Sequence, residues 1–167
     1  MPLSDLLQVP VVLAPLPLVE AIANLAYQRV LSRHPLLFER LDSYGERRFG
    51  FVPTDFPFAF IARPADGRIS VRRKPLREAV DVCVDAPFGM LLALLQGKAD
   101  GDALFFARDI QVEGDMEALL ALRNSLDDAR VDLVDDVLGK GSPLAPLIRT
   151  VMSHLSGGQP REARRWN

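Results

Sequence analysis

The sequence holds few of the side chains on which catalysis and metal binding usually depend. Its one cysteine, Cys83, excludes an intramolecular disulfide and any metal cluster built from cysteine thiolates. Only His34 and His154 could act as bases near neutral pH. His34 closes a predicted helix, His154 stands beside Ser153 on a helix where adjacent side chains diverge, and Cys83 lies among valines. We therefore expect no catalytic residue, no bound metal and no other cofactor.

The sequence also lacks a strong charge excess and a long apolar run. Twenty Lys and Arg against 22 Asp and Glu leave a net charge of -2, so nothing favours nucleic acid as a partner. Pro10, Pro15 and Pro17 interrupt the apolar N-terminal stretch, which has neither the about 20 apolar residues of a bilayer span nor the basic start of a secretory signal. We expect a cytoplasmic protein, with peripheral contact at the inner face of the membrane as an open alternative.

Apolar side chains, in contrast, are plentiful, at 49% of the chain with a mean hydropathy of +0.10. Their spacing changes from a period near 3.6 to a period of two and back again. It predicts strands at 48–53, 57–63, 68–73, 79–85 and 109–114, and helices at 17–34, 36–45, 87–97, 116–128 and 142–158. This order favours an α+β fold with a five-stranded, mostly antiparallel sheet covered by helices on one face.

Three surface groups each leave two interpretations open. The apolar N-terminal arm either lies over the fold or touches a membrane surface or a partner. An amphipathic helix is predicted after it from the helical spacing of Leu18, Ile22, Leu25, Ala26 and Val30. A basic group either guards a sheet edge or holds an anionic lipid head group; it comprises Arg68, Arg72, Arg73, Lys74 and Arg77. An acidic group forms a solvated helix end or a docking face; it comprises Asp127, Asp128, Asp132, Asp135 and Asp136.

The predicted helix Phe88–Gln96 has apolar residues around nearly its whole circumference, so it must be buried on more than one side. Other apolar stripes surround it in the predicted fold. An ordinary core would explain them, and so would a cavity for an apolar ligand. The candidate lining residues are Phe49, Phe51, Phe58, Phe60, Leu91, Leu92, Leu95, Phe105, Phe106, Leu147 and Val151.

The stretch "VDVCVDAPFGMLLALLQGKADGDALFFARDIQVEGD" resembles the sterol-carrier-protein type-two domain family. The resemblance rests on the Leu-rich phrase at 92–98, the pair Phe105–Phe106 and the pair Gly114–Asp115, and it covers about residues 45–128. Ala107 and Arg108 stand where the family often has glycine. The resemblance implies a sterol-carrier-protein-like fold around an apolar cavity, with residues 1–44 as an N-terminal arm and helical extension. Residues 129–167 would add a C-terminal amphipathic helix and a basic tail.

Two stretches, "FVPTDFPFAF" and "GDALFFARDIQVEGDMEALLALRNSLDD", together with the N-terminal helical extension, resemble the UbiT family of bacterial ubiquinone-biosynthesis accessory factors. This resemblance implies a non-catalytic protein of the oxygen-independent route that binds isoprenoid quinone intermediates, phospholipid or another lipid. It implies U32 peptidase-like iron–sulfur proteins as the partners that hydroxylate the ring. A general phospholipid or fatty-acid carrier and a ligand-free interaction scaffold are the alternatives. The helix Leu144–Leu155 is the candidate lid.

Overall fold

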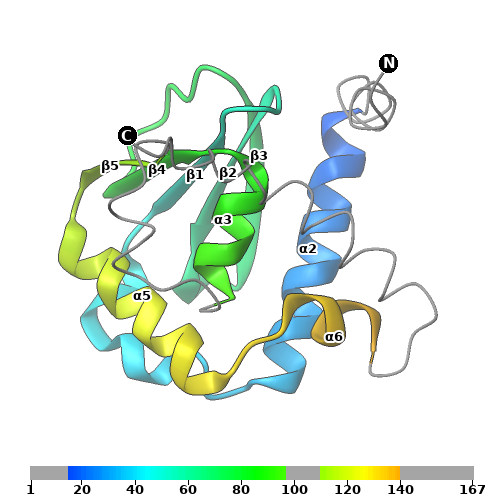
Figure 1. Ribbon diagram of the computed structural model, residues 1–167, viewed down its shortest axis with the longest axis vertical. Coiled ribbons are helices and arrows are strands. Elements are labelled where there is room, and N and C mark those ends of the chain that lie inside the picture. Colours follow the sequence, from blue (N-terminus) through cyan, green and yellow to red (C-terminus); the bar gives the residue numbers. More distant parts are fainter. Residues whose placement is uncertain (1–14, 97–109, 140–167) are drawn as a thin grey trace, which may run out of the picture.

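The computed structural model describes residues 15–96 and 110–139 of the chain. Five strands form one sheet, and helices lie on one of its faces and along one of its edges (Figure 1). The elements are, in chain order, α2 (Leu16–Arg33), η1 (Glu39–Glu46), β1 (Phe49–Pro53), β2 (Phe58–Arg63), η2 (Pro64–Asp66), β3 (Arg68–Arg73), β4 (Val82–Ala86), α3 (Phe88–Leu95), β5 (Gln111–Gly114), α5 (Met116–Ala129) and α6 (Leu133–Leu138).

The sheet has the strand order β3-β2-β1-β4-β5. Neighbouring strands are antiparallel except β1 and β4, which are parallel in the middle of the sheet. Phe51 lies opposite both Phe60 and Val84, so the alternate residues of three strands share one face. The predicted α+β class and the mostly antiparallel sheet are confirmed.

The two faces of the sheet are covered by different kinds of structure. The face that carries Phe51 packs against α3 and α5 and holds the main hydrophobic core. The opposite face is crossed by residues 74–81, which join β3 at one edge to β4 in the interior. At Gly50 a Cβ atom would lie 3.2 Å from side-chain atoms of Leu76 and Val80, so the crossover lies directly against the strand.

The Gly–Asp pair after β5 makes a tight junction with the start of β4. Gly114 has φ of +99°, and a Cβ there would lie 2.2 Å from the carbonyl oxygen of Asp81, so only glycine fits. The next residue, Asp115, donates its N–H to the same oxygen at 2.9 Å. Its side chain accepts from Ala118 N at 3.0 Å and thereby caps the N-terminus of α5.

Helix α2 lies along β3, at the edge of the sheet (Figure 1). Asn24 bonds to Ile69 twice: its Oδ1 accepts from the N–H at 3.0 Å and its Nδ2 donates to the carbonyl at 2.7 Å. Glu20 accepts from Val71 N at 2.9 Å. Gln28, one turn further on, donates to a backbone carbonyl in the turn before β3. This edge row of Glu20, Asn24 and Gln28 satisfies backbone groups that an edge strand would otherwise leave open.

The opposite side of α2 is apolar and faces outward. Leu18, Ile22 and Leu25, here called the outer stripe, are 52%, 60% and 55% exposed. Of the five residues that predicted the amphipathic helix, only Val30 is buried. A surface helix usually turns its apolar stripe to the core, but α2 turns its polar row inward because the edge of β3 needs hydrogen-bond partners.

The acidic group forms a solvated helix end only in part. Asp127 and Asp128 are exposed in the last turn of α5, whereas Asp136 is buried. Asp132 caps α6, a short helix between the predicted helices 116–128 and 142–158.

Asp136 is buried, and its carboxylate bonds to Nε2 of His34 at 2.7 Å. Arg29 donates to the carbonyl of Val137 at 2.7 Å. These contacts attach α6 to α2, so Asp136 satisfies a buried contact instead of meeting water.

Candidate functional site

The candidate site begins with the apolar face of the sheet beneath α3. Phe49 and Phe51 on β1 are buried there together with Val82 and Val84 on β4. Leu91 on α3 packs into the same cluster. Three of the predicted lining residues, Phe49, Phe51 and Leu91, are therefore brought together at the floor of this region.

Helix α3 is apolar on all sides, and none of its residues is exposed. Leu91 and Leu94 are fully buried, whereas Leu92 and Leu95 on its flank are half-buried. Phe60 of β2 is also half-buried and packs against the core. The predicted residues Leu95 and Phe60 thus border the core, and Leu92 is half-buried on the same helix. An apolar ligand at this border could contact both the helix and the sheet.

Two aromatic residues absent from the predicted site extend this border. Phe88, the first residue of α3, lies 6.3 Å from Phe60 and 5.0 Å from Phe56, measured between ring centroids. The N–H of Phe88 donates to Asp55 at 2.8 Å, which fixes the start of the helix. In the sequence, the feature that could have identified Phe88 as a site residue is its place directly after Pro87, where the helix begins. Phe58, also a predicted lining residue, is buried where the Arg73 guanidinium lies 6.0 Å over its ring.

A polar group stands at the C-terminal end of α3. Gln96 Nε2 is buried and has no hydrogen-bond partner. Among residues 15–96 and 110–139, the Tyr27 hydroxyl is the other buried side-chain group without one. Burial, and then the charge of Asp66, raises the pKa of Tyr27. An unsatisfied buried donor costs about 1–3 kcal/mol, which an oxygen on a ligand could offset at Gln96. The sequence signal for Gln96 was a single amide in an otherwise apolar helix.

Four predicted lining residues lie outside the described residues: Phe105, Phe106, Leu147 and Val151. The same holds for the candidate lid Leu144–Leu155 and for His154. Their part in the site stays a prediction. The described chain resumes at Ile110, which packs against the same core as α3.

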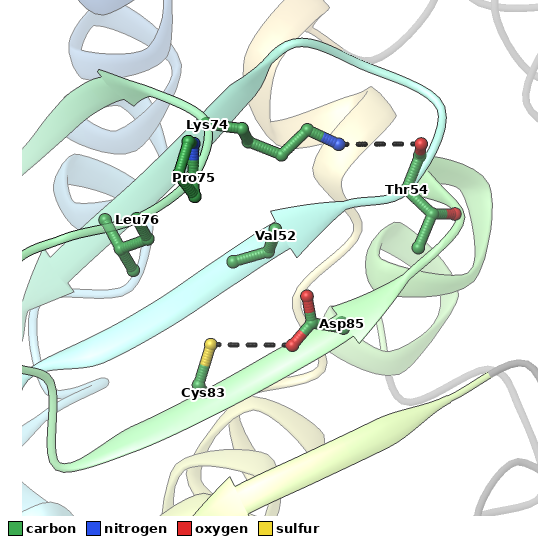
Figure 2. A pocket seen from close by; sticks show the side chains of 7 residues that line it. All are labelled: Val52, Thr54, Lys74, Pro75, Leu76, Cys83 and Asp85. Atoms are coloured by element: carbon green, nitrogen blue, oxygen red, sulfur yellow. Dashed lines mark hydrogen bonds between the residues drawn. The ribbon is translucent and has the colours of Figure 1, made fainter.

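A pocket of about 530 Å³ lies on the opposite face of the sheet (Figure 2). Its lining contains none of the residues that were predicted to contact an apolar ligand. Lys74 Nζ is engaged by the carbonyl oxygen of Pro53 at 2.6 Å, and Cys83 Sγ lies 3.7 Å from the Asp85 carboxylate. Three of its seven lining residues, Thr54, Lys74 and Asp85, are polar or charged, whereas an acyl or isoprenoid chain needs a mainly apolar wall. The lining residues are Val52, Thr54, Lys74, Pro75, Leu76, Cys83 and Asp85.

Two of the candidate reactive side chains, Cys83 and His34, lie in the described part of the chain. Cys83 has a raised pKa, and His34 is hydrogen-bonded to a carboxylate. Burial, and then the neighbouring Asp85 carboxylate, raises the pKa of Cys83 to about 11, so the nucleophilic thiolate is scarce near neutral pH. His34 is held by Asp136 at the end of α2. No group of three or more His, Cys, Asp or Glu side chains suited to a metal ion occurs in the described part of the chain.

None of the helices within 15–96 and 110–139 has both the length and the apolar run that crossing a bilayer requires.

The chain matches a known sequence family. Residues 27–127 fit the profile described as the SCP-2 sterol transfer family. The matched region runs from the second half of α2 through the sheet and α3 to the end of α5. A search of curated protein sequences finds no significant match.

Solved structures show where the same fold occurs. A protein described as the UbiJ-SCP2 ubiquinone synthesis protein superposes with a TM-score of 0.56 at 22% identity, over 71% of this chain and 98% of that chain. Sterol carrier protein 2 from Yarrowia lipolytica, in its apo form, gives a TM-score of 0.46 at 16% identity over 66% and 91%. The sterol carrier protein domain 2 of Helicoverpa armigera gives 0.43 at 18% identity over 62% and 86%. The first comparison, with the family match, confirms the sterol-carrier-protein-like fold.

Proposed function

The chain belongs to the SCP-2 sterol transfer family, and from this premise we propose that it is a non-catalytic lipid-binding accessory factor of ubiquinone biosynthesis. Its ligand is an isoprenoid quinone intermediate or another lipid with a long apolar tail. The tail lies between α3 and the sheet, against the predicted lining residues. The protein presents the ligand to biosynthetic enzymes and carries out no reaction itself.

The observation that carries this proposal is the all-apolar α3 with its half-buried flank. Leu92, Leu95 and Phe60 keep part of their apolar surface outside the closed core. Burial contributes about 0.8 kcal/mol per CH₂ group, so ten tail carbons offer about 8 kcal/mol as an upper bound. An apolar tail can therefore supply most of the affinity without a precise polar contact. By the same arithmetic, a phospholipid acyl chain gains nearly as much.

The placement in ubiquinone biosynthesis draws on sequence resemblance to the UbiT family and on the fold shared with the UbiJ-SCP2 ubiquinone synthesis protein. Within the proposal, Gln96 Nε2 donates to a carbonyl oxygen of the ligand's head group. The resemblance to the UbiT family implies that U32 peptidase-like iron–sulfur partners hydroxylate the ring on the oxygen-independent route. The single cysteine of this chain is consistent with that division, because one thiolate cannot hold such a cluster.

Lipid extraction tests the proposal directly. The full-length protein is purified after anaerobic expression without detergent, extracted with organic solvent and analysed by mass spectrometry. We expect isoprenoid quinone intermediates or another long-chain lipid at a fixed ratio to protein. Recovery of no lipid from a correctly folded preparation would contradict the proposal and favour the interaction scaffold.

A variant pair locates the ligand. Leu95→Trp fills the flank of α3 and should lower the lipid recovered per protein, while overpacking typically costs about 1–3 kcal/mol of stability. Leu120→Trp is the matched control, since Leu120 lies exposed on α5, away from the core. Lipid recovery and the unfolding midpoint are measured on both. Equal lipid recovery from both variants would place the ligand elsewhere.

A further inference from the structure

The outer stripe of α2 is an apolar surface that lies outside the core. Leu18, Ile22 and Leu25 are each more than half exposed, and apolar side chains in line form a contact surface. The helix cannot bury them by turning about its axis, because a turn would break both bonds between Asn24 and Ile69. The stripe therefore requires a cover from outside the sheet.

Helix α6 already covers one end of this side of α2 (Figure 1). With 3.6 residues per turn, Arg29 and Arg33 lie on the same side of α2 as the outer stripe. Arg29 donates to the carbonyl of Val137 in α6 at 2.7 Å. A Cβ at Gly139, directly after α6, would lie 3.9 Å from the Arg33 guanidinium. The described chain therefore leaves α6 at the point where the exposed part of this side begins.

The sequence that follows Gly139 carries an apolar stripe of its own, on the helix predicted at 142–158. The residues of this second stripe are Leu144, Leu147, Ile148, Val151, Met152 and Leu155. The residues between α6 and this helix are few, as in loops that join two antiparallel helices. A helix over 142–158 is about 25 Å long, and α2, with 18 residues, is about 27 Å long. The segment can therefore run back along the whole outer stripe.

The spacing of the two stripes matches in the antiparallel direction. Along α2 the outer stripe advances by four residues and then by three, and the second stripe has the same steps when it is followed backward from Leu155. This alignment sets residue 140 opposite Arg33, one residue from Gly139, which the structure places beside Arg33. The facing pairs are Leu18 with Leu155, Ile22 with Val151, and Leu25 with Ile148.

From these features we infer that segment 142–158 packs as a helix, antiparallel to α2, on the outer stripe. The packing removes both apolar stripes from water. A second copy of this chain is a poorer occupant, because segment 142–158 is tethered beside the stripe and so has a high effective concentration there. The predicted lining residues Leu147 and Val151 then belong to this helix pair, and the lipid tail keeps those on α3 and the sheet. The inference does not rest on the proposed function, because the helix pair needs no ligand.

Cysteine cross-linking of the full-length chain tests the inference. Cys83→Ser removes the native thiol, and Ile22→Cys is combined with Val151→Cys and oxidised at low protein concentration. Facing positions of packed helices come within reach of a disulfide. We therefore expect an intramolecular disulfide to form about tenfold faster or more than in the control pair Leu120→Cys and Val151→Cys, since Leu120 is exposed on α5. Mass spectrometry after trapping of free thiols measures the cross-linked fraction.

The pair Leu92→Cys and Val151→Cys tests the lid over the ligand in the same way, and circular dichroism establishes that each variant is folded. The inference is overturned if the Ile22 pair oxidises no faster than the Leu120 pair, or if the Leu92 pair oxidises fastest. A disulfide of the Ile22 pair that forms only between two chains would assign the stripe to a second copy and would overturn it too.

Alkylation of a single thiol gives a second measurement that does not depend on disulfide geometry. In the chain with Cys83→Ser and Ile22→Cys, iodoacetamide should react slowly, because the second stripe covers the thiol. Adding Val151→Asp should speed the reaction about tenfold or more, since a carboxylate in the helix pair opens it. Ser153→Asp is the matched control, because Ser153 lies on the other side of the predicted helix. Equal rates in the two variants would overturn the inference.

Discussion

Replacing Asn24 by alanine measures what the edge row contributes to stability. The substitution removes two hydrogen bonds to Ile69, at 3.0 and 2.7 Å. Each contributes about 1 kcal/mol net, and alanine returns about 0.6 kcal/mol through its higher helix propensity. We therefore expect Asn24→Ala to lower the free energy of unfolding by about 1.5 kcal/mol.

Urea denaturation followed by circular dichroism gives this quantity. With a slope of about 2 kcal/mol per molar urea, the midpoint should fall by about 0.7 M. Gln28→Ala is the matched control on the same face of α2, because it removes one exposed bond to the backbone and should cost about 0.5 kcal/mol or less. If Asn24→Ala left the midpoint where it is, or moved it no more than Gln28→Ala, the paired bonds between Asn24 and Ile69 would not hold the helix against β3, and the reasoning would be refuted.

Two further predictions concern backbone geometry and the thiol. Gly114→Ala should destabilise the fold severely, by about 3 kcal/mol or more in urea denaturation, because its Cβ would meet the Asp81 carbonyl at a positive φ; a near-wild-type midpoint would show that the junction can shift. Cys83, with its pKa raised to about 11 by burial and Asp85, should react slowly with iodoacetamide near neutral pH, and Asp85→Asn should speed the reaction. Since the folded pKa lies above the ordinary 9.0, this thiol adds stability below that pH and loses it as the pH rises toward 11; unchanged stability across that window would contradict the assignment.

The strands were the most predictable part of the fold. A sheet with one buried face imposes alternation on its sequence, and β3 was predicted with its observed bounds of 68–73. The same alternation identified Phe49 and Phe51, which the structure places in one cluster with Leu91. A pattern of this kind shows which residues share a face, and the sheet needs only that information to define its core side.

Helix α2 shows why the remainder could not be predicted in the same way. Helical spacing identifies Leu18, Ile22 and Leu25 as one stripe, but it does not say which side of the helix meets the protein. The open backbone of β3 decides that, through contacts between Asn24 and Ile69 that are 45 residues apart. Asp136 is a similar case, because its partner His34 is 102 residues away. The local sequence does not show which hydrogen-bond partners will come from distant parts of the chain.

In the described part of the chain, both edge strands of the sheet are protected against pairing with strands from other molecules. On one border, Asn24 and Glu20 occupy the hydrogen-bonding groups of β3. On the other, β5 is only four residues long and exposes the charge of Glu113. Under the proposed function, a protein that has released an apolar ligand would be prone to polymerise if an open strand offered a template. Among residues 15–96 and 110–139, both edge strands are protected against this. The emptied protein should therefore stay dispersed until it is loaded again.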